Sequence, residues 1–101
     1  MLVSRWQAPI LPTRQQMALM LESEGLEAHE EVIPPGAQIA DHRHPFDEVR
    51  IVVSGELRLD IAGNRLLLRA GDRILIPANT RHSKQAGDED ACVCLCAMKA
   101  D

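Results

Sequence analysis

The chain has 101 residues, of which 46% are hydrophobic and 26% are charged, and its formal net charge at pH 7 is −4. This length and composition suit one folded domain and exclude an intrinsically disordered chain. The negative charge and an aromatic content of 2% argue against a nucleic-acid-binding protein, which needs basic and stacking side chains.

No apolar run in the sequence is long enough to cross a bilayer, since the longest, Ala91–Met98, has only the length of a strand. The first nine residues lack the apolar stretch of a signal peptide. An odd number of cysteines, three, is poor material for a disulfide framework. We therefore expect a cytoplasmic protein without a membrane partner.

An irregular arm and one short helix open the chain. Pro9 and Pro12 are expected to prevent regular structure in the first dozen residues. Thr13 is a suitable N-cap, and Gln16 follows at the spacing of a capping box. Gly25 suits the position just after the last helical residue. The pattern predicts a helix between Thr13 and Gly25.

After this helix the apolar residues recur with the period of a strand, and turns rich in Gly and Pro separate the runs. The predicted strands are Glu27–Pro34, Val49–Ser54, Leu57–Ile61, Arg65–Arg69, Arg73–Pro77 and Ala91–Met98. Many short strands of this kind indicate an all-β sandwich or barrel. We therefore predict a single domain, with the arm and helix in residues 1–26 and a barrel in residues 27–101.

Four side chains offer the donor atoms of a metal site: His42, His44, Glu48 and His82. On an extended segment, residues two apart point to the same side, so His42 and His44 present their imidazoles together. Three imidazoles and one carboxylate suit one divalent ion of Mn, Fe, Co, Ni, Cu or Zn. An octahedral ion would keep two positions for water or substrate. His29 has no partner at ligand spacing and is interpreted as an ordinary strand residue.

The spacing around these residues resembles the first motif of the cupin family, G-x5-H-x-H-x3-E-x6-G. The matching residues are Gly36, His42, His44, Glu48 and Gly55. The second cupin motif, G-x5-P-x-G-x2-H-x3-N, is matched at Gly71, Pro77 and His82. The resemblance runs from about Glu27 to Met98, which is most of the chain.

Two positions depart from the second motif. Asn79 stands where the family usually has glycine, and asparagine is the best substitute in a left-handed turn. Ala86 replaces the usual asparagine, which removes a side-chain hydrogen bond but no metal ligand. We expect the turn to survive and the four candidate ligands to be unaffected.

The resemblance implies a double-stranded β-helix, the small antiparallel jelly-roll barrel of RmlC-like cupins, of the short type common in bacteria. It implies one metal ion in the mouth of the barrel, a small-molecule pocket and a homodimer. Dioxygenase, decarboxylase and isomerase activities occur in the family, so one hypothesis is a metal-dependent enzyme acting on a small oxygenated substrate. The alternative is a non-catalytic ligand-binding or sensor domain that acts through a partner. A purely structural barrel is a third reading.

Two further features concern the lining of the pocket. If Glu48 points inward, the period of the strand sends Arg50 inward too, where it could anchor a substrate anion. Alternatively, Arg50 turns to solvent or to an acidic neighbour. Cys92, Cys94 and Cys96 share one face of a strand and are interpreted as small buried side chains, although a soft-metal site is conceivable. If that face looks into the barrel, at least one thiol could approach the pocket.

Overall fold

The computed structural model describes residues 2–99, which form nine strands and one helix. The elements are β1 (Leu2–Ser4), α1 (Arg14–Ser23), β2 (His29–Ile33), β3 (Gln38–His42), β4 (Asp47–Ser54), β5 (Glu56–Ile61), β6 (Asn64–Arg69), β7 (Arg73–Ile76), β8 (His82–Ala86) and β9 (Cys92–Lys99). Within this described part, no helix is long and apolar enough to span a membrane.

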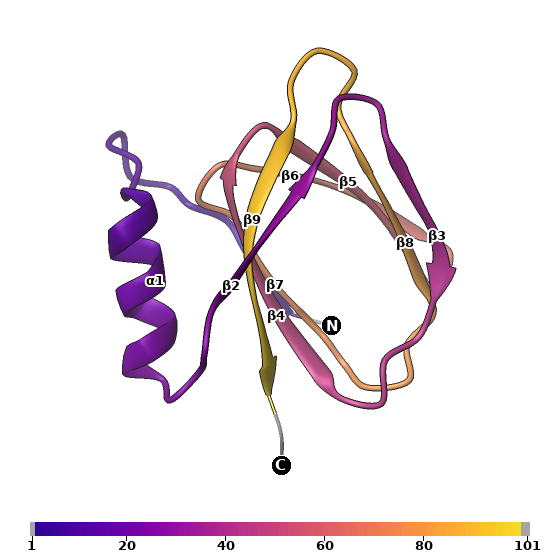
Figure 1. Ribbon diagram of the computed structural model, residues 1–101, viewed down its shortest axis with the longest axis horizontal. Helices are drawn as coiled ribbons and strands as arrows, with labels where there is room; N and C mark the ends of the chain where they lie inside the picture. Colours follow the sequence, from indigo (N-terminus) through magenta and orange to yellow (C-terminus); the bar gives the residue numbers. More distant parts are fainter. Residues whose placement is uncertain (1, 100–101) are drawn as a thin grey trace.

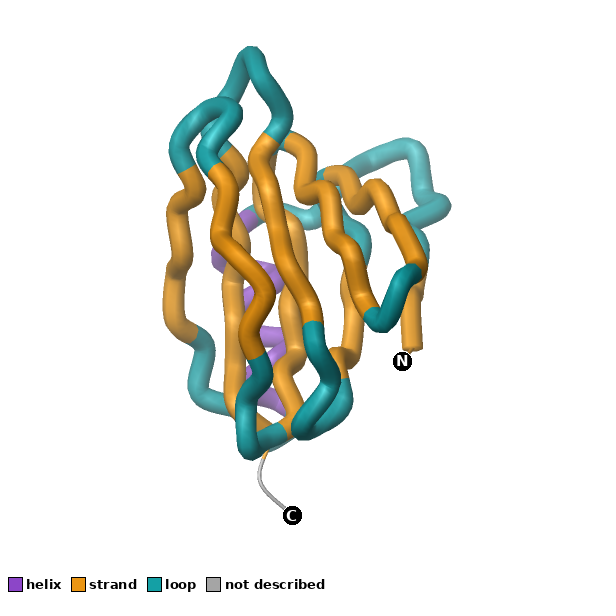
Figure 2. The backbone as a smooth tube through the Cα atoms, turned by 90° about the vertical axis from the view of Figure 1, so that its right-hand side faces the viewer, coloured by secondary structure: helices purple, strands orange, loops and turns teal. Residues whose placement is uncertain are grey.

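The strands build two antiparallel sheets that face each other (Figures 1 and 2). The five-stranded sheet has the order β1-β7-β4-β9-β2, and the four-stranded sheet has the order β3-β8-β5-β6. The helix α1 lies outside the five-stranded sheet, on the side away from β3 and β8 (Figure 1). The prediction of an all-β jelly-roll barrel with a short N-terminal helix is therefore confirmed.

The helix begins with the capping box that the sequence predicts. The Thr13 hydroxyl accepts a hydrogen bond from the Gln16 amide at 3.1 Å, and the Gln16 side chain accepts one from the Thr13 amide at 2.8 Å. Gly25 follows the helix with a φ of 79°, a conformation that glycine adopts without strain. Met17 and Leu21 are the buried residues of the helix, and they anchor it to the five-stranded sheet.

The strand β4 lies at the centre of the five-stranded sheet and is covered on both faces. Val49 and Ile51 pack in one apolar cluster with Met17 and Leu21 of the helix. Val52 belongs to a second cluster, inside the barrel. The other interior members of that cluster are Ile33, Leu57, Leu59, Ile61, Leu68, Ile74, Ile76, Ala86, Cys92 and Cys94. The pleat that turns Val49 and Ile51 toward the helix turns Glu48 and Arg50 toward the barrel interior.

Three strands lie outside the predicted set. The expectation of an irregular arm is wrong for Leu2–Ser4, which pair with β7 as a short edge strand. β3 and β8 pair with each other, although their sequences, Gln-Ile-Ala-Asp-His and His-Ser-Lys-Gln-Ala, are mostly polar. Pairing partners far away in the sequence, rather than local β propensity, make these segments strands.

Candidate metal centre

The predicted ligands lie at one end of the barrel, at or next to the ends of β3, β4 and β8. His42 ends β3 and lies opposite His82, the first residue of β8, in the register of the two strands. His44 follows in the connection to β4, and its carbonyl accepts a hydrogen bond of 2.6 Å from the Asn79 amide. Asn79 has a φ of 59°, so it makes the left-handed turn expected in place of glycine. The bond ties together the two loops that position the histidines.

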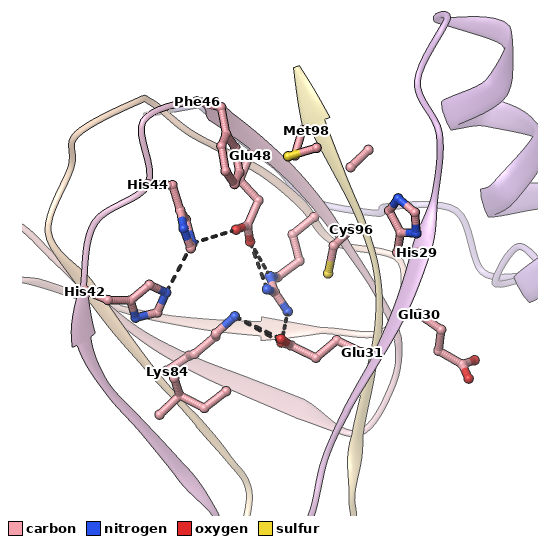
Figure 3. A pocket seen from close by; sticks show the side chains of 13 residues that line it. His29, Glu30, Glu31, His42, His44, Phe46, Glu48, Lys84, Cys96 and Met98 are labelled. Carbon is pink, nitrogen blue, oxygen red and sulfur yellow. Dashed lines mark hydrogen bonds and ion pairs between the residues drawn. The ribbon is translucent and has the colours of Figure 1, made fainter. Parts of the chain in front are cut away.

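The structure brings the three histidines into one cluster. One ring nitrogen of each of His42, His44 and His82 lies within 4.8 Å of the others. The Nε2 atoms of His42 and His44 are 3.1 Å apart. The Oε2 atom of Glu48 lies 3.1 Å from Nε2 of His44, so the carboxylate borders the cluster (Figure 3).

Backbone carbonyls orient two of the rings. Nδ1 of His42 lies 2.9 Å from the Ala40 carbonyl, and Nδ1 of His82 lies 2.9 Å from the Thr80 carbonyl. A carbonyl oxygen only accepts hydrogen bonds, so both Nδ1 atoms carry the proton and both Nε2 atoms present a lone pair. The buried Nε2 atom of His82 has no hydrogen-bond partner among the described residues. An unpaired lone pair of this kind fits a metal ligand.

The electrostatics of the cluster favour the protonation states that metal binding requires. Burial is the main cause that lowers the pKa of His44 and of His82, and it keeps both rings neutral near pH 7. Burial alone would raise the pKa of Glu48, but the Arg50 and Lys84 charges outweigh it and lower that pKa. Neutral imidazoles beside an ionised carboxylate form a donor set that a divalent transition metal accepts.

Arg50 points inward and is fully enclosed, with 1% of its side chain exposed. Its Nε and Nη2 atoms lie 2.9 and 2.8 Å from Oε1 of Glu48, and its Nη1 atom lies 2.6 Å from Oε1 of Glu31. Acidic neighbours therefore balance its charge. The bond to Arg50 also holds the Glu48 side chain with Oε2 toward His44 (Figure 3). A direct contact between Arg50 and a substrate anion stays a prediction.

A cavity of about 400 Å³ opens beside the cluster. Its lining consists of His29, Glu30, Glu31, Ile39, His42, His44, Phe46, Glu48, Arg50, Lys84, Cys96, Ala97 and Met98. Glu31, Phe46 and Lys84 are lining residues beyond those predicted from the sequence. Counting two residues on from His82 would have predicted an inward Lys84. No local signal marks Glu31, because its partners lie on β4 and β8.

The three cysteines face the barrel interior. Cys92 and Cys94 are fully buried in the apolar cluster, with their sulfur atoms 3.6 Å apart. Cys96 is partly buried and lines the cavity. The row thus reaches from the apolar core to the pocket wall.

Comparisons with known proteins agree with this architecture. Residues 29–98 match the model of the cupin domain family, whereas no curated protein matches the chain. A cupin protein from Bacteroides fragilis superimposes with a TM-score of 0.65 at 25% identity, over 72% of this chain and 64% of its own. The structure of KdgF from Halomonas sp. gives a TM-score of 0.63 at 28% identity, over 75% and 71% of the two chains.

A larger protein is also similar in structure. The DMSP lyase DddQ from Ruegeria pomeroyi DSS-3 superimposes with a TM-score of 0.68 at 25% identity. The match covers 75% of this chain but only 39% of the lyase. The similarity to DddQ is thus confined to a part of that enzyme.

Proposed function

The chain belongs to the cupin domain family, and from this premise we propose that it is a metal-dependent enzyme acting on a small oxygenated substrate. His42, His44, His82 and Glu48 would hold one divalent transition-metal ion. One observation carries the proposal: three imidazoles converge beside a carboxylate, and the buried Nε2 atom of His82 lacks a partner among the residues described.

The residues of the chain prepare this site in three ways. The Ala40 and Thr80 carbonyls fix the orientation of two rings. Arg50 keeps the Glu48 carboxylate ionised and aligned. The apolar side chains beside the cluster exclude part of the water from the cavity, and they include Phe46, stacked on His44 with ring centroids 4.9 Å apart. A bound ion of this class supplies Lewis acidity or redox chemistry to an oxygen-bearing ligand.

The similarity to a DMSP lyase is consistent with catalysis in a barrel of this kind. The alternative function, a non-catalytic ligand-binding domain acting through a partner, would use the same pocket. The dioxygenase, decarboxylase and isomerase hypotheses all require an ion that exchanges its bound water for substrate. A sensor requires only reversible ligand binding.

The first test is the metal content of untagged protein, purified without chelator or nickel resin and measured by plasma mass spectrometry. We expect close to one transition-metal ion per chain. A His44→Ala variant should lose the ion and keep its circular dichroism spectrum, because the apolar core lies elsewhere in the barrel. His29→Ala is the matched control, since His29 lines the cavity outside the histidine cluster.

Two results would overturn the proposal. One is wild-type protein that takes up no metal on reconstitution with Fe, Mn, Co, Ni, Cu or Zn. The other is a His44→Ala variant with full occupancy. With Mn²⁺ bound, the relaxation rate of the water protons measures water exchange at the ion. Fast exchange indicates an open coordination position, whereas no exchange indicates a closed, purely structural site.

We also propose the homodimer that the family resemblance implies. The arm and helix expose apolar side chains in quantity, with Ile10 81%, Leu11 51% and Leu19 55% exposed. Exposed apolar surface of this kind can be buried in a subunit interface. Light scattering should give twice the chain mass of 11.2 kDa, and a single 11.2 kDa species at high concentration would contradict the dimer.

A further inference from the structure

A chain of alternating charges crosses the cavity next to the histidine cluster. Glu48 and Arg50 come from β4, Glu31 from β2 and Lys84 from β8. Oε1 of Glu31 lies 2.6 Å from Nη1 of Arg50 and 3.0 Å from Nζ of Lys84, and its Oε2 lies 3.3 Å from the same Nζ. A single carboxylate therefore serves two cations and bridges the two sheets (Figure 3).

The members of this network differ in burial. The side chains of Arg50 and Lys84 are 1% and 4% exposed, whereas that of Glu31 is 34% exposed. Glu31 also lies on β2, one of the two edge strands of its sheet. It is thus the member of the network that lies nearest to solvent and can rotate into it with the least rearrangement of its neighbours. Lys84 has no other acidic partner among the described residues, so it would then need another anion.

The charge balance of the pocket also favours the binding of an anion. Arg50 and Lys84 contribute two positive charges, Glu31 and Glu48 contribute two negative charges, and the network is neutral. The Glu30 carboxylate lies outside it, bound to Arg14 of the helix at 2.9 Å. A divalent ion on the histidines would leave an excess of two positive charges in a half-enclosed cavity. Such an excess favours a negatively charged ligand.

We propose that the ligand of this pocket is a small organic carboxylate, and that Glu31 is a displaceable counter-ion occupying the position on Lys84 and Arg50 that the carboxylate of the ligand takes. The inference rests on the proposed function for the identity of the pocket. The Glu31 side chain is itself a carboxylate bound at this point, so the geometry already shows that the two cations accept that group. Glu31 occupies this position between the sheets until the ligand replaces it.

A purely structural role for Glu31 leads to different expectations. In that case Glu31 would neutralise two buried cations permanently, and its loss would only destabilise the barrel. A displaceable Glu31 competes with the ligand, so its removal must strengthen the binding of anions. The sign of the change in affinity decides between the two roles.

The test uses the full chain, reconstituted with Co²⁺ and also metal-free, titrated with succinate or with its neutral analogue succinamide. Calorimetry gives the affinity, and the visible spectrum of Co²⁺ reports that the ion stays bound. We expect succinate to bind at least about tenfold more tightly than succinamide, since the loss of a charged hydrogen bond has that size. Glu31→Gln should tighten succinate binding, and Lys84→Met should weaken it by about tenfold or more.

Matched controls keep the result specific. Glu22→Gln removes an exposed carboxylate of the helix that does not line the cavity, and Lys99→Met removes an exposed lysine of β9, so neither should change the affinity for succinate. Lys84→Arg keeps the charge and should retain binding, which covers the case in which Lys84→Met fails to fold. Equal affinity for succinate in wild type, Glu31→Gln and Lys84→Met would overturn the inference. Failure to bind metal would instead overturn the proposed function, and the metal-free titration still tests the role of Lys84.

Discussion

The interior of this barrel has an apolar end and a polar end, and the same strands build both. On β4, Glu48 and Arg50 face the cavity, whereas Val52, two residues later on the same face, belongs to the apolar core. On β8, His82 and Lys84 likewise precede Ala86. The difference shows how a small barrel separates its tasks, since one end supplies buried apolar area and the other supplies charged and ligating groups.

The two ends also respond differently to loss of a side chain. A cavity in the apolar end costs packing and transfer free energy. A missing charge in the polar end leaves its partner buried without compensation. Substitutions of similar size at the two ends therefore test whether the division is real.

The largest effect is expected from Arg50→Met. This change removes the cation that pairs with Glu48 and Glu31 while filling much of the same volume. Breaking a buried ion pair on one side costs about 3–5 kcal/mol, so urea unfolding should show a loss of that order. Arg58→Met, at an exposed arginine of β5, should stay within about 0.5 kcal/mol of wild type. An Arg50→Met protein more stable than wild type would show that the ion network is a net cost.

A loss of about 3 kcal/mol is expected from Leu59→Ala in the apolar end, where the side chain is 2% exposed. Leu67→Ala on the neighbouring strand β6 is the control, because Leu67 is 37% exposed and should tolerate the change. Leu59→Ala should leave metal stoichiometry at one per chain, measured by plasma mass spectrometry. Loss of metal at unchanged secondary structure would mean that the two ends are not independent.

The division of the barrel into an apolar and a polar end explains which strands could be predicted from the sequence. β5 alternates apolar and polar residues, whereas β6 and β7 carry short apolar runs, and turns with Gly, Pro or Asn bound all three, so the sequence predicts them as strands. β3 and β8 were missed because they carry polar residues even at interior positions such as His42, His82 and Lys84. The two strands that hold His42, His82 and Lys84 are thus the ones whose local pattern is weakest.

The clustering of the three histidines could be predicted for a different reason. The spacing of His42, His44, Glu48 and His82 matches a family motif, and such spacing survives where strand patterning fails. The ion pair between Glu31 and Lys84 spans 53 residues of sequence and depends on how the two sheets face each other. Nothing within either segment predicts that contact, because only the tertiary fold brings the two side chains together.

Metal binding should stabilise the folded protein through ligands that all lie in the polar end. An ion that binds only the folded state adds about 2.7 kcal/mol when its free concentration is 100 times its Kd. We expect this gain in thermal or urea unfolding of wild-type protein with the preferred ion, relative to metal-free protein. His44→Ala should show no gain in the free energy of unfolding when metal is added. Leu59→Ala, in the apolar end, should show the full gain, although its free energy of unfolding is lower than that of the wild type. An equal gain in His44→Ala would place the ion elsewhere.

The smallest effect concerns the pH dependence of the metal-free protein. Burial lowers the pKa of His44 and of His82 below the ordinary value of 6.5, so below that pH the unfolded chain binds protons that the folded chain resists. Stability contributed by these rings is present above about pH 6.5 and declines as the pH falls through the lowered values, by at most about 1.4 kcal/mol per pH unit for each ring. Urea unfolding of metal-free protein between pH 7.5 and about 5 measures the decline. His44→Ala should flatten the slope and Leu59→Ala should not, since Leu59 carries no titratable group and belongs to the apolar cluster. A slope in His44→Ala equal to that of the wild type would show that His44 does not contribute to it.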